Sequence, residues 1–313
     1  MSALVPLIEV GGSGGSPFTF TGEDNGATLR KIWVWFAGDR VKAVQVWLTD
    51  GGVQKFGKEG GEVFEFEFKD GEKITSLTLW ANGVGTRLGG IKFETNHSRE
   101  FFAKPIVCVH TKEYPIDVGS GICLGVAGRS GSDIDCMGFL FINTVKSTEL
   151  TNVNYPTIKN AHPQIVTEEV KSFTYENDTE AVQSYTAETT ITVTTKSSWS
   201  LPNKMESMFS VIVQAGIPEV VEGPNGSIFI VGPVSSYDLE NTKETSDNFS
   251  YPVQVLPNKS VEVGITIGRV TVDLPYTGTV EVTCDNGGVL KINTNGEYNG
   301  VIYDDVKTVV KDK

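Results

Sequence analysis

Residues 209–233 read FSVIVQAGIPEVVEGPNGSIFIVGP, and this stretch decides how the second half of the chain can fold. Two apolar runs, 209–213 and 228–231, flank a middle section in which Gly and Pro prevent a continuous helix. The pattern therefore predicts a β-hairpin. An ordinary half-buried hairpin has this pattern, and so does a hairpin that moves from water into lipid.

The rest of the chain also has β character. Runs rich in Val, Ile, Thr, Phe and Trp alternate with Asp-Gly and Asn-Gly turn signals, and no stretch keeps a helical period. At 313 residues the chain is long enough for two domains, each with its own core. We therefore expect an all-β protein of two domains.

The charge of the chain limits its partners. The formal net charge is −13 and the isoelectric point is about 4.8, so we expect no nucleic-acid partner. Residues 1–145 hold 14 basic and 17 acidic residues and the remainder holds 12 and 22, so the second half alone carries −10. This uneven charge indicates that the two halves have different tasks.

The N-terminal sequence MSALVPLIEV lacks the basic segment and the long apolar core of a signal peptide. We therefore expect a soluble protein that is cytoplasmic or leaves the cell by an unconventional route. Four cysteines lack metal-ligand spacing, and three lie on apolar runs, which predicts buried free thiols at Cys108, Cys123, Cys136 and Cys284. We expect no metal and no cofactor.

Two loops in the first half have the composition of a sugar site. The loop GGSGG at residues 11–15 formally matches the hydrolase pattern GxSxG, but a strand-like run follows it where that pattern needs a helix. Its glycines instead allow a ligand to approach the main-chain N–H groups. The loop GRSGSDID at 128–135 ends in a carboxylate, which can accept hydrogen bonds from two sugar hydroxyls.

These loops, with AGDRVKAVQVWLTDG, GEKITSLTLWANG and LGGIKFETN between them, resemble the jacalin-related lectins over about residues 1–145. The resemblance implies a β-prism of three four-stranded sheets. It also implies a mannose site in which Asp135 is the carboxylate, the Ser132 and Asp133 backbones donate, and the loops contribute Gly131, Gly14 and Gly15. A second site is not expected, because Lys42 stands where some members have its carboxylate.

The tryptophans in the first half of the chain have two interpretations. Trp33, Trp35, Trp47 and Trp80 lie on strand-like runs, where aromatic residues usually belong to the core. Sugar-stacking platforms are the alternative. We favour the core.

The second half of the chain differs from the first because it consists mainly of long strand-like runs rich in Thr and Ser. Its phrases TTKSSWS, AGIPEVVEG and YPVQVLPNKSVEVGITIGRVTVDLPYTGTVEV resemble the aerolysin-type module of natterin-like proteins over about residues 146–313. The resemblance implies an elongated β module that follows the lectin domain. It also implies a hairpin, about residues 199–238, that refolds into a transmembrane barrel after oligomerisation. The candidate membrane-facing residues are Met205, Phe209, Val211, Val213, Ile217, Ile228 and Ile230.

The expected function is a mannose-binding or high-mannose-binding pore former that docks on glycosylated membranes. We expect a monomer or dimer in solution and a ring on the membrane. The alternative is a glycan-binding lectin whose C-terminal half is a structural or dimerising stalk without pore activity. Catalysis is not expected, because the histidines are scattered and no opposed pair of carboxylates stands out.

Overall fold

The computed structural model describes residues 1–103, 112–224 and 226–313, which group by contact into two units. The first unit comprises Met1–Thr151, Leu201–Ile212 and Gly278–Asn295. The second comprises Asn152–Ser200, Val213–Thr277 and Gly296–Lys313. Because each unit is assembled from separated stretches, the boundary expected after residue 145 stays a prediction.

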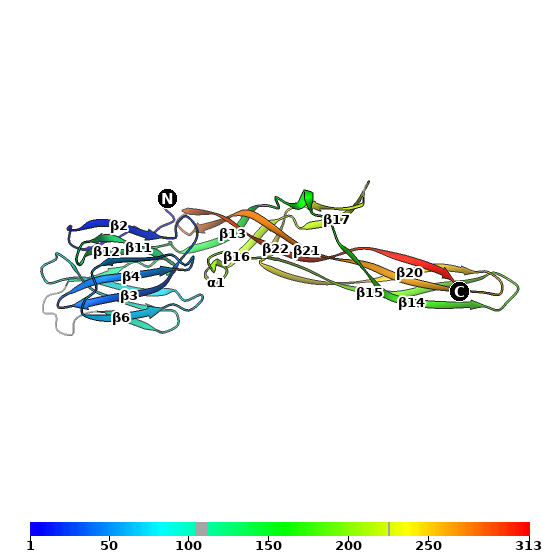
Figure 1. Ribbon diagram of the computed structural model, residues 1–313, viewed down its shortest axis with the longest axis horizontal. Coiled ribbons are helices and arrows are strands. Elements are labelled where there is room, and N and C mark those ends of the chain that lie inside the picture. The colour runs from blue at the N-terminus through cyan, green and yellow to red at the C-terminus, as the bar shows by residue number, and fades with distance from the viewer. Residues whose placement is uncertain (104–111, 225) are drawn as a thin grey trace. The chain divides into compact units, whose positions relative to one another are not determined.

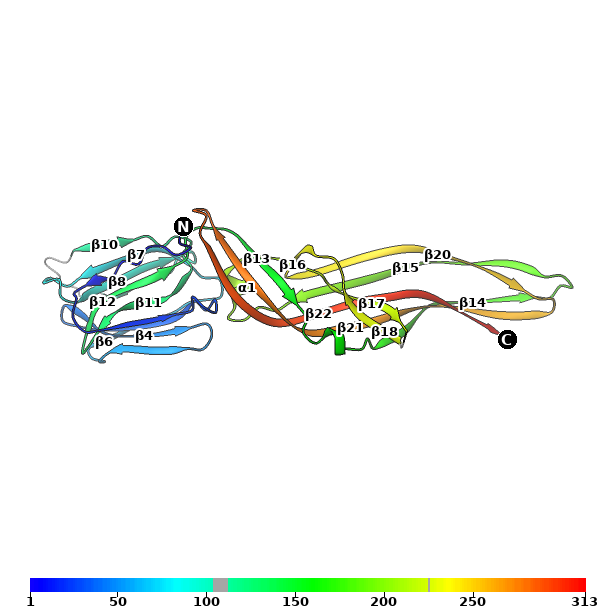
Figure 2. The same cartoon turned by 90° about the horizontal axis from the view of Figure 1, so that it is seen from above.

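The first unit contains three antiparallel sheets of four strands each, which are visible in Figures 1 and 2. One sheet has the order β1 (Val10–Gly11), β12 (Ile134–Phe141), β11 (Cys123–Ser130) and β2 (Ser16–Thr21). The next has the order β10 (Glu113–Ile116), β7 (Ile74–Ala81), β8 (Leu88–Thr95) and β9 (Glu100–Ala103). The last has the order β5 (Val53–Gly57), β4 (Arg40–Leu48), β3 (Leu29–Ala37) and β6 (Glu62–Glu67).

Strand alternation builds the core between these sheets. In β3 the buried side chains Ile32, Val34 and Phe36 alternate with half-buried Trp33 and Trp35. Inward residues of all three sheets share one hydrophobic cluster. The predicted β-prism is therefore confirmed.

The tryptophan prediction is correct for one residue and wrong for three. Trp80 is buried, with 4% of its surface exposed. Trp33, Trp35 and Trp47 are half-buried on the outer face of the sheet, opposite the core residues of the same strands. Periodicity places them on one face but does not tell which face is covered.

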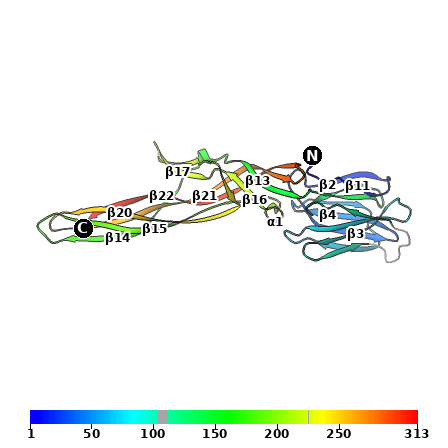
Figure 3. The same ribbon diagram turned by 180° about the vertical axis from the view of Figure 1, so that it is seen from behind.

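A large sheet of long strands follows. Its order is β19 (Ser235–Asp238), β16 (Val211–Ala215), β13 (Val145–Asn154), β21 (Lys259–Cys284), β22 (Val289–Asp312), β15 (Gln183–Trp199) and β20 (Glu240–Val255), with β14 (Ile165–Asn177) paired to β21. Figure 3 shows β14, β15 and β20 along this sheet. A short 3-10 helix, η1 (Ile158–Asn160), precedes β14. In the second unit most residues of β14 are exposed, whereas buried residues recur along β21, and two of the hydrophobic clusters there lie around Ala187 and Ile191.

The 209–233 stretch contains a hairpin, but its two strands are not the two apolar runs that were expected to pair. The two apolar runs do not pair with each other, since β16 lies between β13 and β19. Instead, β17 (Pro218–Gly223) pairs with β18 (Gly226–Val231), and Pro218 lies opposite Val231. The Gly and Pro residues that end β16 allow the chain to turn out of the large sheet before this hairpin begins.

The residues before β16 also depart from the expected strand. Residues 205–208 form one helical turn, α1 (Met205–Met208), preceded by Asn203 and Lys204 in the left-handed region. From residue 209 onward the side chains alternate between two faces, because Phe209, Val211, Val213 and Ala215 are buried whereas Ser210 and Ile212 are exposed.

The described cysteines agree with the thiol prediction. Cys123, Cys136 and Cys284 are buried and free, while Cys108 lies outside the described residues. Burial raises the pKa of the Cys123 thiol to about 12, so it stays protonated near neutral pH. None of the helices in the described ranges has the length and apolar character that a membrane crossing requires.

Candidate glycan site at the prism apex

Asp135 lies beneath the glycine loop at one end of the prism. It is the second residue of β12, which pairs with β1, and the amide of Gly12 donates to the Asp135 carbonyl at 2.8 Å. A Cβ at Gly14 would lie 2.4 Å from Asp135 Oδ1, and a Cβ at Gly15 would lie 2.4 Å from Oδ2. Only glycine therefore allows the loop backbone to lie against both carboxylate oxygens.

Arg129 also holds the glycine loop in place. Its Nε donates to the Gly14 carbonyl at 2.8 Å, and its Nη2 donates to the Gly15 carbonyl at 2.8 Å. The Gly15 backbone has φ of 65°, which a residue with a Cβ adopts only at a cost. These contacts fix the loop over the carboxylate.

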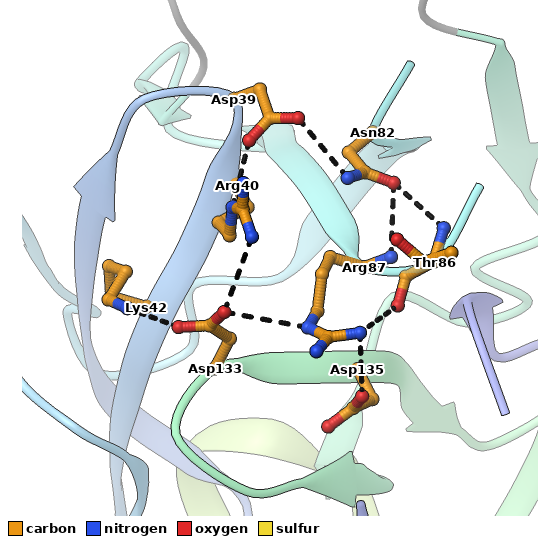
Figure 4. A network of polar contacts seen from close by, with 8 residues as sticks. All are labelled: Asp39, Arg40, Lys42, Asn82, Thr86, Arg87, Asp133 and Asp135. Carbon is orange, nitrogen blue, oxygen red and sulfur yellow. Dashed lines mark hydrogen bonds and ion pairs between the residues drawn. The ribbon is translucent and has the colours of Figure 1, made fainter. Parts of the chain in front are cut away.

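Asp133 is bound by three basic side chains. It forms a hydrogen-bonded ion pair with Lys42 and lies 3.6 Å from Arg40 Nη1 and 3.5 Å from Arg87 Nε (Figure 4). Burial acts to raise the pKa of this carboxyl, but the Lys42 hydrogen bond and the charges of Lys42, Arg40 and Arg87 outweigh it, so the pKa is lowered. Asp133 therefore stays ionised and organises the apex.

Arg87 joins the two aspartates. Its Nη1 contacts Asp135 Oδ1 at 3.0 Å and donates to the Thr86 carbonyl at 2.7 Å (Figure 4). The loop that carries Arg87 is shaped by Asn82, whose Oδ1 accepts from the Thr86 amide at 2.8 Å and from the Arg87 amide at 3.1 Å. Asn82 also donates to Asp39 Oδ2 at 3.2 Å, which ties this loop to the β3–β4 turn.

The predicted site residues converge. Gly14, Gly15 and Asp135 adjoin one another, and Gly131 and Ser132 are exposed on the neighbouring loop. One expectation needs correction: Asp135 is 3% exposed and is the second residue of β12, whereas we expected it at the end of a loop. Sequence reasoning also missed Arg40, Lys42 and Arg87, because no motif links positions so distant in the chain.

The arrangement can bind vicinal hydroxyl groups. Asp135 supplies carboxylate acceptors, and the Arg87 guanidinium supplies donors beside the same oxygen. A sugar hydroxyl can donate to the first and accept from the second. None of the described His, Cys, Asp and Glu residues forms a group of three or more that could hold a metal ion.

The candidate membrane residues fall into two groups. Met205, Phe209, Val211 and Val213 are buried, so they do not form a free apolar surface in this structure. Ile228 and Ile230 are 43% and 39% exposed on β18, and Ile217 is half-buried before β17. The assignment of these residues to a membrane hairpin stays a prediction.

Comparison with known proteins gives the class and then the family. The jacalin-like lectin domain family matches residues 7–140, which include the glycine loop and both aspartates. The crystal structure of lamprey immune protein matches over 100% of both chains with 48% identity and a TM-score of 0.95. A Malaysian banana lectin covers 46% of this chain and 100% of its own, with 27% identity and a TM-score of 0.37.

An aerolysin-like protein of Bombina maxima covers 53% of this chain and 99% of its own, with 14% identity and a TM-score of 0.34. A search of curated protein sequences found no match. The protein is therefore an all-β protein with an N-terminal jacalin-like lectin domain. The chain belongs to the family of lamprey immune protein, and the resemblance of its first half to the jacalin-related lectins is confirmed.

Proposed function

We propose that this protein binds mannose or high-mannose glycans at the apex, oligomerises on glycosylated membranes and inserts one hairpin per subunit into a β-barrel. The observation that carries the glycan assignment is the enclosure of the Asp135 carboxylate by Gly14 and Gly15, with Arg87 beside it. The jacalin-like match over residues 7–140 supports the same assignment.

The β17–β18 hairpin supports the membrane role. It exposes Ile228 and Ile230 on one face in a chain of net charge −13. Each of its strands has six residues, or about 20 Å, whereas the hydrocarbon core is about 30 Å thick. Insertion therefore requires the flanking residues within 199–238 to join the hairpin, and a closed ring must pair every strand edge.

A second candidate function is a lectin with a structural or dimerising stalk. The observation that favours it is the length of two strands, 26 residues in β21 and 24 in β22, because long strands suit an extended stalk. Both candidates are binding proteins without catalysis, made soluble and present as a monomer or dimer before any membrane step. The pore former differs in becoming a ring on the membrane.

The glycan assignment is tested on a mannose column. Asp135→Asn keeps the size of the side chain but removes the charge, and loss of charge-assisted hydrogen bonds at about 1.5–3 kcal/mol each should abolish retention. Ser132→Ala is the matched control, because its hydroxyl is exposed on the adjacent loop and should not matter. Retention of Asp135→Asn equal to the parent would refute the site.

The pore assignment is tested by dye release from mannosylated vesicles. Changing Ile228 and Ile230 together to Asn should leave folding and mannose binding intact, since both side chains are exposed, but should slow leakage. The same change at Val309 and Val310, which are 44% and 46% exposed on β22, is the control and should leak normally. A parent protein that binds vesicles without releasing dye would favour the stalk.

A further inference from the structure

The outer face of the β5-β4-β3-β6 sheet carries an aromatic corner that the lectin site does not use. Trp33 contacts Trp47 with ring centroids 5.0 Å apart at 65°, and contacts Trp35 at 5.9 Å and 71°. The rings are half-buried, so their remaining surfaces face outward. We call Trp33, Trp35 and Trp47 the aromatic corner.

The corner already holds an ammonium group. Lys31 Nζ lies 4.8 Å from the Trp33 ring centroid and 5.3 Å from the Trp47 ring centroid. Glu67 Oε2 lies 3.9 Å from the same nitrogen. Two tryptophan faces and a carboxylate around one cation form the environment that aromatic cages offer to quaternary ammonium ligands.

The ring geometry argues against a sugar at this place. A sugar ring stacks on one flat, open aromatic face, whereas these rings meet at 65° and 71° and Lys31 lies over two of them. A compact cation contacts two inclined faces at once. The geometry of the aromatic corner therefore suits a compact cation better than a sugar ring.

We propose that the aromatic corner binds the choline headgroup of membrane lipids, in exchange for the Lys31 ammonium. The trimethylammonium group takes the place over Trp33 and Trp47, and Glu67 offsets its charge. The released Lys31 side chain, anchored beside the corner, is within reach of the phosphate that follows choline in the lipid. The site thus recognises both charges of a phosphocholine group.

The surroundings of the corner favour a lipid as the occupant. Val53 lies opposite Trp47 in the β4–β5 ladder and is 42% exposed, and Val63 lies opposite Trp35 in the β3–β6 ladder and is 41% exposed. Tryptophan with exposed aliphatic neighbours suits the boundary between headgroups and acyl chains.

The charge around the corner is balanced, which also favours a bilayer. Arg30 and Lys31 pair with Glu67, Lys55 pairs with Glu59, and Glu65 lies opposite Trp33, so three basic and three acidic side chains lie near the corner. This face can therefore approach a zwitterionic bilayer although the chain carries −13. The choice of a lipid rests on the proposed membrane function, whereas choline binding itself does not.

The first test titrates the intact protein with choline and with phosphocholine and follows tryptophan fluorescence, with free mannose present to occupy the apex. Lys31→Met removes the internal competitor, so choline should bind more tightly than to the parent. The parent should prefer phosphocholine over choline, and Lys31→Met should lose that preference. Trp47→Ala should weaken choline binding about fivefold or more.

Phe102→Ala is the matched control. Lys92 Nζ lies 5.8 Å from the Phe102 ring on another sheet, and the Trp80 ring beside Phe102 is buried, so this place offers a cation and one exposed aromatic side chain but no open corner. Choline binding should be unchanged in this variant. If Lys31→Met leaves the affinity for choline unchanged and Trp47→Ala binds it normally, the proposal is wrong.

The second test compares vesicles of phosphatidylcholine with vesicles of phosphatidyl-N-methylethanolamine, both without glycan. The two lipids have the same net charge and differ by two methyl groups. The parent should bind the first at least several-fold better, and free phosphocholine should compete. Equal binding to both vesicles would overturn choline recognition, and choline-sensitive binding of a trimethyl-lysine peptide without vesicle binding would overturn the lipid assignment.

Discussion

Arg87 Nη1 lies 3.0 Å from Asp135 Oδ1, so the carboxylate predicted to receive sugar hydroxyls already shares one oxygen with a cation. The same guanidinium places Nε 3.5 Å from Asp133 Oδ2. Arg87 thus connects the loop at residues 82–87 to the segment at 133–135, which is distant in the sequence. Glycan affinity should depend on this bridge as much as on the carboxylate.

Arg87→Lys should weaken mannose binding about tenfold. Lysine keeps the charge but lacks the planar fork that contacts both aspartates, and loss of one charged hydrogen bond at about 1.5 kcal/mol corresponds to that factor. Isothermal titration with mannose measures the change. Lys92→Met, at a half-buried lysine on β8 that none of the apex contacts involves, is the control. Equal affinity in Arg87→Lys and the parent would contradict the bridge.

Gly15→Ala should abolish mannose binding while the protein stays folded. The added Cβ would lie 2.4 Å from Asp135 Oδ2 and 2.7 Å from the Ser130 carbonyl oxygen, at a φ of 65°. Gly51→Ala separates this clash from backbone strain, because Gly51 has φ of 87° and nothing within 4 Å of its added Cβ. Glycan binding measured for both should fall only for Gly15→Ala.

Asp133→Asn should destabilise the protein by about 1–3 kcal/mol at pH 7, because Lys42 loses its charged partner in a largely buried pair. The pKa of Asp133 is lowered in the folded state, so its contribution is present above the unfolded value near 3.9. The contribution is lost as the pH falls through the lower, folded value. Urea unfolding at several pH values should show a constant difference from pH 7 to 5 that shrinks below about pH 4. A difference that persists in full at pH 2 would contradict this.

Met205→Ala should loosen the 201–212 segment. Met205 is fully buried, and its Sδ and Cε lie 2.8 Å from the position of a Cβ on Gly26. Lys204 also pairs with Asp70 at 2.6 Å, and Asn203 donates to the Asn25 carbonyl at 2.8 Å. Loss of a buried Met costs about 2–5 kcal/mol.

Hydrogen exchange measures this effect directly. Amides of residues 201–212 should exchange faster in Met205→Ala, and vesicle leakage should be faster if the segment must detach before the short β17–β18 hairpin lengthens. Ile212→Ala, at a side chain 39% exposed in the same segment, is the control and should change neither. Unchanged exchange in Met205→Ala would show that this contact does not hold the segment.

The site was only partly predictable. The glycine loop and Asp135 are recognisable because each belongs to a short motif in which the backbone itself needs glycine. Lys42 and Asp133 are 91 positions apart, and their ion pair depends on how β4 and the β11–β12 loop meet. Lysine at position 42 indicated the absence of a second carboxylate site, but not that its ammonium supports the first.

The sequence by itself determined the all-β class and the buried thiols at the three described positions, because side-chain period and turn residues act locally, and its resemblance to the jacalin-related lectins implied the β-prism. Only the tertiary structure decided that β18 pairs with β17 rather than with β16, and that Met205 begins a helical turn. It also decided that Trp33, Trp35 and Trp47 line an outer face. The physical reason is that period divides a strand into two faces, whereas burial depends on which distant strands cover each face.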